Sequence, residues 1–107
     1  MFIVQEKALR VAGGLRELIP MLKKRDADLC RQLQRAMNSV VLNLAEGAGN
    51  DPGTARARFA SACGSAKEVR AGLKLAAAYG FLPEAEAAEL DAELDSVCAM
   101  SWRLSGR

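Results

Sequence analysis

Apolar residues recur along the whole chain at alternating steps of three and four, the spacing of one face of an α-helix. Strict alternation of apolar and polar positions, which marks a half-buried strand, does not occur in the sequence. Short stretches rich in Gly, Pro and Asp divide the helical pattern into four segments. The pattern therefore predicts an all-α protein with four helices.

The first two segments each predict one long helix. We expect the first helix from about residue 3 to 24, kinked or ended early by Pro20, because proline lacks the amide donor that a helix interior needs. Asp26 or Asp28 can cap the second helix, which should extend to about Ala48. A run of Gly, Asn, Asp and Pro then ends it.

Two further helices follow. Asp51 or Thr54 can begin the third helix, and Gly80 fits a glycine cap at its end. Pro83 suits the first turn of the fourth helix, where the missing amide donor has no cost. Short connections favour a single domain over residues 1–107, an antiparallel up-down-up-down four-helix bundle with left-handed crossing. The positions expected to face its core in the first and fourth helices are Val4, Ala8, Val11, Leu15, Leu18, Leu22, Ala87, Leu90, Leu94, Val97, Ser101 and Leu104.

Polar residues form a strip along the apolar faces of the second and third helices. Apolar residues such as Leu42 flank the strip on its far side, so it does not have the pattern of a solvated face. We expect the two strips to face each other or a neighbouring subunit, because buried polar groups need hydrogen-bond partners. The residues of this expected network or subunit interface are Arg35, Ser39, Asn43, Glu46, Arg58, Ser61, Ser65 and Glu68.

Within this network, Arg35 or Arg58 is expected to pair with Glu46 or Glu68. The alternative is a set of local Ser and Asn bonds with half-exposed glutamates. Glu46 and Glu68 are not expected to be a catalytic acid/base pair, because the sequence supplies no nucleophile, metal site or phosphate loop beside them. We therefore expect no enzyme activity.

Composition bears on assembly and on cofactors. Twenty alanines and five aromatic residues supply little apolar area for one core, so self-association would bury more. Cys30, Cys63 and Cys98 are far apart and the chain has no histidine, so we expect no metal or other cofactor and three buried thiols. No apolar run is long enough to span a membrane, and no signal-peptide pattern opens the chain, so we expect a cytoplasmic protein.

Charge is distributed unevenly along the chain. The first 80 residues carry a net charge of +6 and the last 27 carry −4. The residues expected to form a basic surface suited to a phosphate backbone are Lys23, Lys24, Arg25, Arg31, Arg56, Lys67, Arg70 and Lys74. The alternative is an ordinary solvated helix face. Few aromatic residues are available for base stacking, so any binding should depend on the backbone and on salt.

Two motifs of the sequence resemble those of the bacterial four helix bundle protein family, also called the 23S rRNA intervening-sequence protein family. The resemblance covers roughly residues 30 to 82. At Asn50 and Arg58 the chain departs from the residues usual in relatives, which are Arg and Glu. The matching residues are Gln32 or Gln34, Arg35, Ala36, Ser39, Val40, Asn43, Leu44, Ala45, Glu46, Gly47, Phe59, Gly64, Ser65 and Glu68.

The resemblance implies a function as well as a fold. Characterised relatives are homopentamers, so it implies a homo-oligomer arranged as a ring or barrel. Relatives are encoded in rRNA intervening sequences, and a related bundle family binds a reverse transcriptase and nucleic acid. The resemblance therefore implies a nucleic-acid-associated accessory protein that binds RNA or DNA. The alternative is a protein-interaction scaffold or adaptor without nucleic-acid binding.

Overall fold

The computed structural model describes residues 2–106 and contains four long helices. They are α1 (Ile3–Arg25), α2 (Ala27–Gly49), α3 (Pro52–Ala78) and α4 (Glu84–Leu104). The expected all-α class and the four-helix bundle are confirmed.

Two aspartates define the starts of the central helices. The Asp26 carboxylate accepts a hydrogen bond of 2.9 Å from the Leu29 amide, and this caps α2. The Asp51 carboxylate accepts one of 3.1 Å from the Thr54 amide at the start of α3. That bond to the Thr54 amide lowers the pKa of the Asp51 carboxyl.

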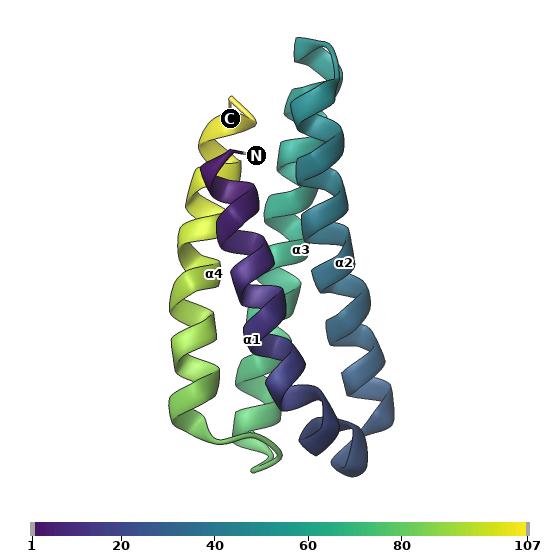
Figure 1. Cartoon of the computed structure of the whole chain (residues 1–107), viewed down its shortest axis with the longest axis vertical. Coiled ribbons are helices and arrows are strands. Elements are labelled where there is room, and N and C mark those ends of the chain that lie inside the picture. The colour runs from purple at the N-terminus through teal and green to yellow at the C-terminus, as the bar shows by residue number, and fades with distance from the viewer. Residues whose placement is uncertain (1, 107) are drawn as a thin grey trace.

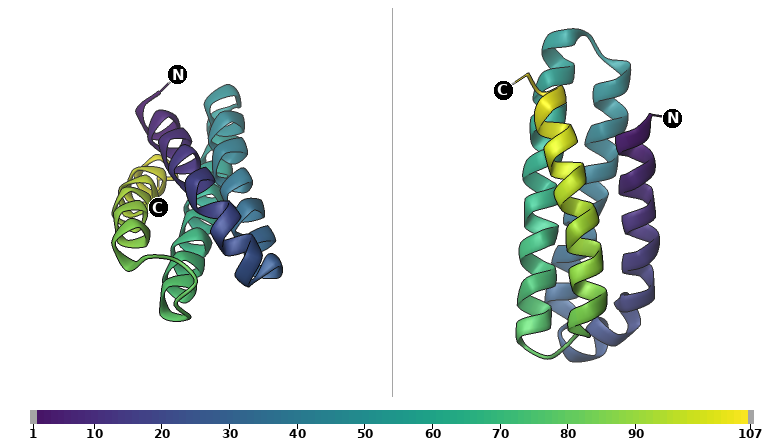
Figure 2. Two further views of the ribbon diagram at one scale, coloured as in Figure 1. Left: turned by 60° about the horizontal axis from the view of Figure 1, so that its bottom comes forward. Right: turned by 90° about the vertical axis from the view of Figure 1, so that its left-hand side faces the viewer.

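Consecutive helices run in opposite directions, and both ends of the described chain lie at the same end of the bundle (Figure 1). The hairpin between α2 and α3 extends beyond those ends (Figures 1 and 2). α1 packs against α2 and α4, and α3 packs against the same two helices. α2 and α4 consequently occupy opposite corners of the bundle (Figure 2). The hand of the helix crossing stays a prediction.

The core follows the predicted apolar spacing with few exceptions. All six expected positions of α1 are buried. In α4, Ala87, Leu94, Val97 and Ser101 are buried and Leu90 is half-buried. The prediction that Leu104 is buried is wrong, since its side chain is 43% exposed. Leu104 lies in the last turn of α4, beside the start of α1. The three cysteines are buried and free, as expected.

Pro20 does not end α1. The helix is continuous to Arg25, so the prediction of an early end is wrong. Pro20 is exposed, and its ring therefore lies outside the core. Proline has no amide hydrogen to donate to the carbonyl four residues earlier, that of Arg16. Arg16 is on the solvent-exposed side of the helix, where water can donate to this carbonyl instead.

Candidate functional site

The polar strips of α2 and α3 meet at a direct contact between two serines. The hydroxyl oxygens of Ser39 and Ser65 are 2.7 Å apart and share a hydrogen bond. One turn further along α2, the Asn43 amide donates to the Ser39 carbonyl at 2.9 Å and to the Ser39 hydroxyl at 3.0 Å. All three residues are half-buried. Ser39 is therefore the centre of a small network that links the two helices.

Close approach of the two backbones makes this short contact possible. Gly47 of α2 lies against the ring of Phe59, and Gly72 of α3 lies against Leu33. A side chain at either glycine would collide with the opposite helix. Two glycines therefore hold α2 and α3 close together on both sides of the Ser39–Ser65 pair.

One of the ion pairs left open by the sequence forms within the chain. The Arg58 guanidinium and the Glu46 carboxylate are 2.9 Å apart, and both side chains are about half exposed. Arg35, Ser61 and Glu68 are exposed, and the structure does not bring them into this network. Glu68 instead lies beside a small hollow of about 140 Å³ between α2 and α3. In a single chain the strip is thus open to water along its outer side.

The basic residues at the junction of α1 and α2 form an exposed group. Lys23, Lys24 and Arg25 occupy the last turn of α1. Their positive charges there interact favourably with the negative end of the helix dipole. Lys23 and Arg31 line a hollow of about 240 Å³ between the two helices. Arg31 makes a loose, exposed contact of 3.4 Å with Asp28.

Arg70 is not part of a free basic surface. Its guanidinium is 2.8 Å from the Asp91 carboxylate and 2.9 Å from that of Asp95, so it connects α3 to α4. The hydrogen bond between Arg70 and Asp91 raises the pKa of the arginine and lowers that of the aspartate. The acidic fourth helix therefore pairs with Arg70 within the chain, and a role of Arg70 in a nucleic-acid surface stays a prediction.

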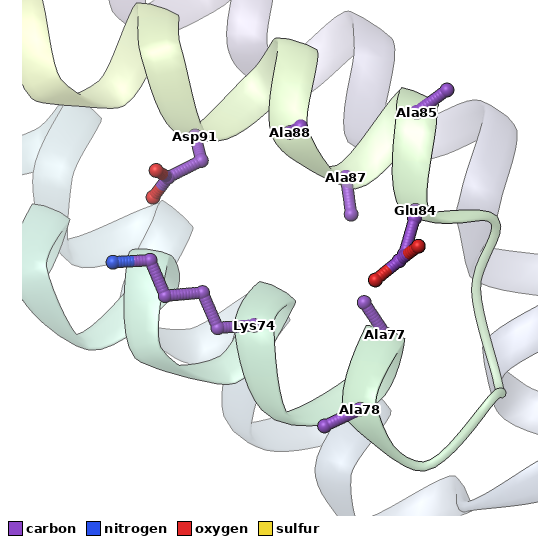
Figure 3. A pocket seen from close by; sticks show the side chains of 8 residues that line it. All are labelled: Lys74, Ala77, Ala78, Glu84, Ala85, Ala87, Ala88 and Asp91. Atoms are coloured by element: carbon purple, nitrogen blue, oxygen red, sulfur yellow. The ribbon is translucent and has the colours of Figure 1, made fainter.

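Lys74 lies at the edge of a hollow between α3 and α4 (Figure 3). The hollow has a volume of about 530 Å³, and alanines of both helices form most of its wall. Asp91 and Glu84 also line it, so the charge of Lys74 has acidic neighbours. Arg56 and Lys67 are exposed elsewhere on α3. The basic surface of α3 is therefore smaller than the sequence suggests.

Neither a metal centre nor a membrane span emerges from the part of the chain that the structure describes. Residues 2–106 contain no group of three or more Cys, Asp or Glu side chains that could hold a metal ion. Over the same residues, no helix combines the length and the apolar character needed to cross a membrane.

Comparison with known proteins gives a family and a fold. No curated protein matches the chain. A solved structure of a protein of unknown function, from the S23 ribosomal protein family of Bacteroides thetaiotaomicron VPI-5482, is similar with a TM-score of 0.90. The similarity covers 98% of this chain and 100% of that chain at 15% sequence identity, which is evidence of a shared fold. The family model for "23S rRNA-intervening sequence protein" matches residues 2–103. The chain therefore belongs to the family of 23S rRNA-intervening sequence proteins.

Proposed function

We propose that this chain is a non-enzymatic, cytoplasmic accessory protein that associates with copies of itself and binds the backbone of RNA or DNA. By resemblance to relatives, the assembly is a ring of five subunits. The observation that carries the proposal is the exposed cationic group in the last turn of α1, beside the start of α2, composed of Lys23, Lys24 and Arg25. The names of the family and of the structural relative, which refer to 23S rRNA and to a ribosomal protein, agree with it.

The outer side of α2 and α3 supports self-association. Ser39, Asn43 and Ser65 are only half-buried in one chain, and the neighbouring Leu42 is 61% exposed. A partner that covers this surface would bury Leu42 together with the half-buried polar strip, and an interface with an apolar centre and polar groups beside it has this composition. Covering it would withdraw both groups from water and complete their contacts.

Backbone binding is the mode of nucleic-acid recognition that these surfaces favour. Lysine and arginine neutralise phosphates and release counterions, which makes affinity fall steeply with salt. Tyr79 and Trp102 are the exposed aromatic residues of the described chain, and they are far apart, because Tyr79 directly follows α3, near the start of α4, and Trp102 lies near the end of α4. A stacking platform for single-stranded bases needs several such side chains in a row. Sequence-specific reading of bases is therefore not proposed.

Fluorescence anisotropy with a labelled RNA duplex tests this proposal. The variant Lys23→Gln, Lys24→Gln, Arg25→Gln removes three charges from the basic group. If each contacts one phosphate, the slope of log affinity against log salt should decrease by roughly 2 to 3. The control variant Lys7→Gln, Arg10→Gln, Arg16→Gln removes three charges from the body of α1 and should change the slope much less. Absence of duplex binding at low salt, or equal loss in both variants, would contradict the proposed site.

A protein-interaction scaffold or adaptor is the second candidate, with a reverse transcriptase or another protein as its partner. Two observations favour it: Arg70 is neutralised within the chain, and the alanine-lined hollow of Figure 3 offers an apolar contact surface. Affinity capture from lysate treated with nuclease distinguishes the candidates. Retention of a protein partner without RNA, together with no duplex binding by the purified chain, would favour the scaffold.

A further inference from the structure

α2 and α4 each carry an outward-facing stripe of residues with the 4-3-4-3 spacing of a helix-packing seam. The side chains of the first stripe are all exposed. In the second, Ser96 and Met100 are half-buried and the others are exposed. The α2 stripe consists of Arg31, Arg35, Asn38, Leu42 and Ala45, and the α4 stripe consists of Glu89, Glu93, Ser96, Met100 and Arg103.

The two stripes are chemically complementary in the same order. Each begins with two charged residues, basic on α2 and acidic on α4, followed by a polar and then an apolar residue. The last position of the α4 stripe is basic, and the residue beside the last position of the α2 stripe is Glu46. Within the described chain, Arg35, Glu89 and Glu93 form no salt bridge, so their charges are available to a partner.

The heights of these residues also match. α2 and α4 start at the same end of the bundle and run in the same direction (Figure 1). At a rise of about 1.5 Å per residue, Arg31 lies ~6 Å and Glu89 ~7.5 Å from the start of its helix. By the same rise, Leu42 lies ~22 Å and Met100 ~24 Å along. In a neighbouring copy with the same orientation, Arg31 would therefore lie level with Glu89, and Leu42 level with Met100.

The apolar residue of each stripe, Leu42 on α2 and Met100 on α4, lines a surface hollow. Leu42 lies at the rim of a hollow of about 240 Å³ that Leu9 and Val41 also line. Met100 lines a hollow of about 510 Å³ together with Ile3 and Leu104. Exposed ion pairs contribute little to the stability of a contact. Packing of Leu42 against Met100 would thus supply stability, while the charges would select the partner and its register.

We infer that the α2 stripe of one copy docks in parallel against the α4 stripe of the next copy. Arg31 and Arg35 then face Glu89 and Glu93, and Leu42 packs against Met100. α2 and α4 lie at opposite corners of the bundle (Figure 2), and both stripes are on the outer sides of these helices. Each copy would therefore contact two neighbours, head to tail. Such a contact closes into a ring when its rotation permits. The inference rests on the proposed self-association and identifies the two surfaces that carry it.

Charge reversal on each stripe, alone and together, tests the contact. Arg31→Glu with Arg35→Glu places like charges opposite Glu89 and Glu93, and Glu89→Arg with Glu93→Arg does the same from the other side. Either pair should reduce the mass measured by light scattering from that of an oligomer to the 11.4 kDa of one chain. All four changes in one chain restore opposite charges and should restore the oligomer. Leu42→Asp should also disrupt assembly.

The control reverses two exposed arginines outside both stripes, Arg10→Glu with Arg16→Glu, and should leave the mass unchanged. Circular dichroism checks that every variant keeps its helices. If the unaltered chain is monomeric, the proposed self-association and this inference both fail. If the unaltered chain is oligomeric but the fourfold variant does not regain its mass, the inference fails and the self-association stands.

Discussion

Phe59 of α3 lies directly over Gly47 of α2. A Cβ atom at Gly47 would come within 2.6 Å of the Phe59 ring. The same ring meets Phe2 edge-on, with 6.2 Å between the ring centroids. A glycine and a phenylalanine that the sequence presents as parts of a motif are thus two halves of one packing contact. This contact joins three helices at the end of the bundle where the described chain begins.

Replacement of Gly47 by alanine should destabilise the protein by up to about 2 kcal/mol. The added methyl group forces the Phe59 ring or a backbone to move, which costs about 1 to 3 kcal/mol and is offset in part by the better helix propensity of alanine. Urea unfolding measures the difference. Gly64→Ala is the matched control: no atom lies within 4 Å of its Cβ position, so it should stabilise α3 by about 1 kcal/mol. Equal stabilisation by both substitutions would show that the Gly47 contact is not tight.

The sequence predicts the buried faces of the helices well because burial in a bundle repeats with the helical period. Its errors occur where that period does not decide the outcome. Pro20 is tolerated because it faces water, and Leu104 is 43% exposed because it lines a hollow beside the start of α1. The exposure of each residue depends on which other helix packs against it. The apolar pattern of the residue's own helix does not determine this.

The polar and charged contacts were harder to predict for the same reason. The sequence allows Glu46 to pair with Arg35 or Arg58, and the choice of Arg58 follows from the register of α2 against α3. The pairing of Arg70 cannot be read from α3 alone, because both of its partners lie on α4. Asp91 and Asp95 are four residues apart on α4 and form a two-oxygen site for a cation from α3. That spacing was a usable signal.

Coupling between Ser39 and Ser65 can be measured by a double-mutant cycle. Each serine changed to alanine loses a shared hydrogen bond but gains helix propensity, so either single variant should change stability little. The cycle removes the propensity terms and should leave a coupling free energy of about 0.5 to 1 kcal/mol. Urea unfolding of the four chains gives this value. A coupling near zero would mean that water replaces the 2.7 Å bond at no cost.

The three thiols should be unreactive in the folded protein. Cys30, Cys63 and Cys98 are all buried, and burial raises the pKa of the Cys98 thiol, which suppresses the reactive thiolate. A colorimetric thiol reagent at neutral pH should therefore modify them at the rate of unfolding, and all three should react rapidly in urea. Rapid reaction of one thiol in the native protein would indicate local opening there and would support a redox role.

The Arg70–Asp91 pair should make stability depend on pH in the acidic range. Arg70 lowers the folded-state pKa of Asp91 below the unfolded value of about 4. The stabilisation is therefore fully present above about pH 4 and is lost as pH falls through the lowered, folded-state pKa. Asp91→Asn should reduce stability at neutral pH by about 1 to 2 kcal/mol, because a partly buried charged hydrogen bond is lost. It should also flatten the decline of stability below pH 4.

Asp95→Asn is the matched control for this prediction. Asp95 binds the same guanidinium, but its side chain is 68% exposed, compared with 20% for Asp91. Its removal leaves the partly buried Arg70–Asp91 pair intact, so stability at neutral pH should change by less than about 0.5 kcal/mol, since exposed ion pairs contribute little. Urea unfolding of the three chains at a series of pH values tests both expectations. If Asp91→Asn and the unaltered chain lose stability in parallel as the pH falls, this pair is not the source of acid sensitivity.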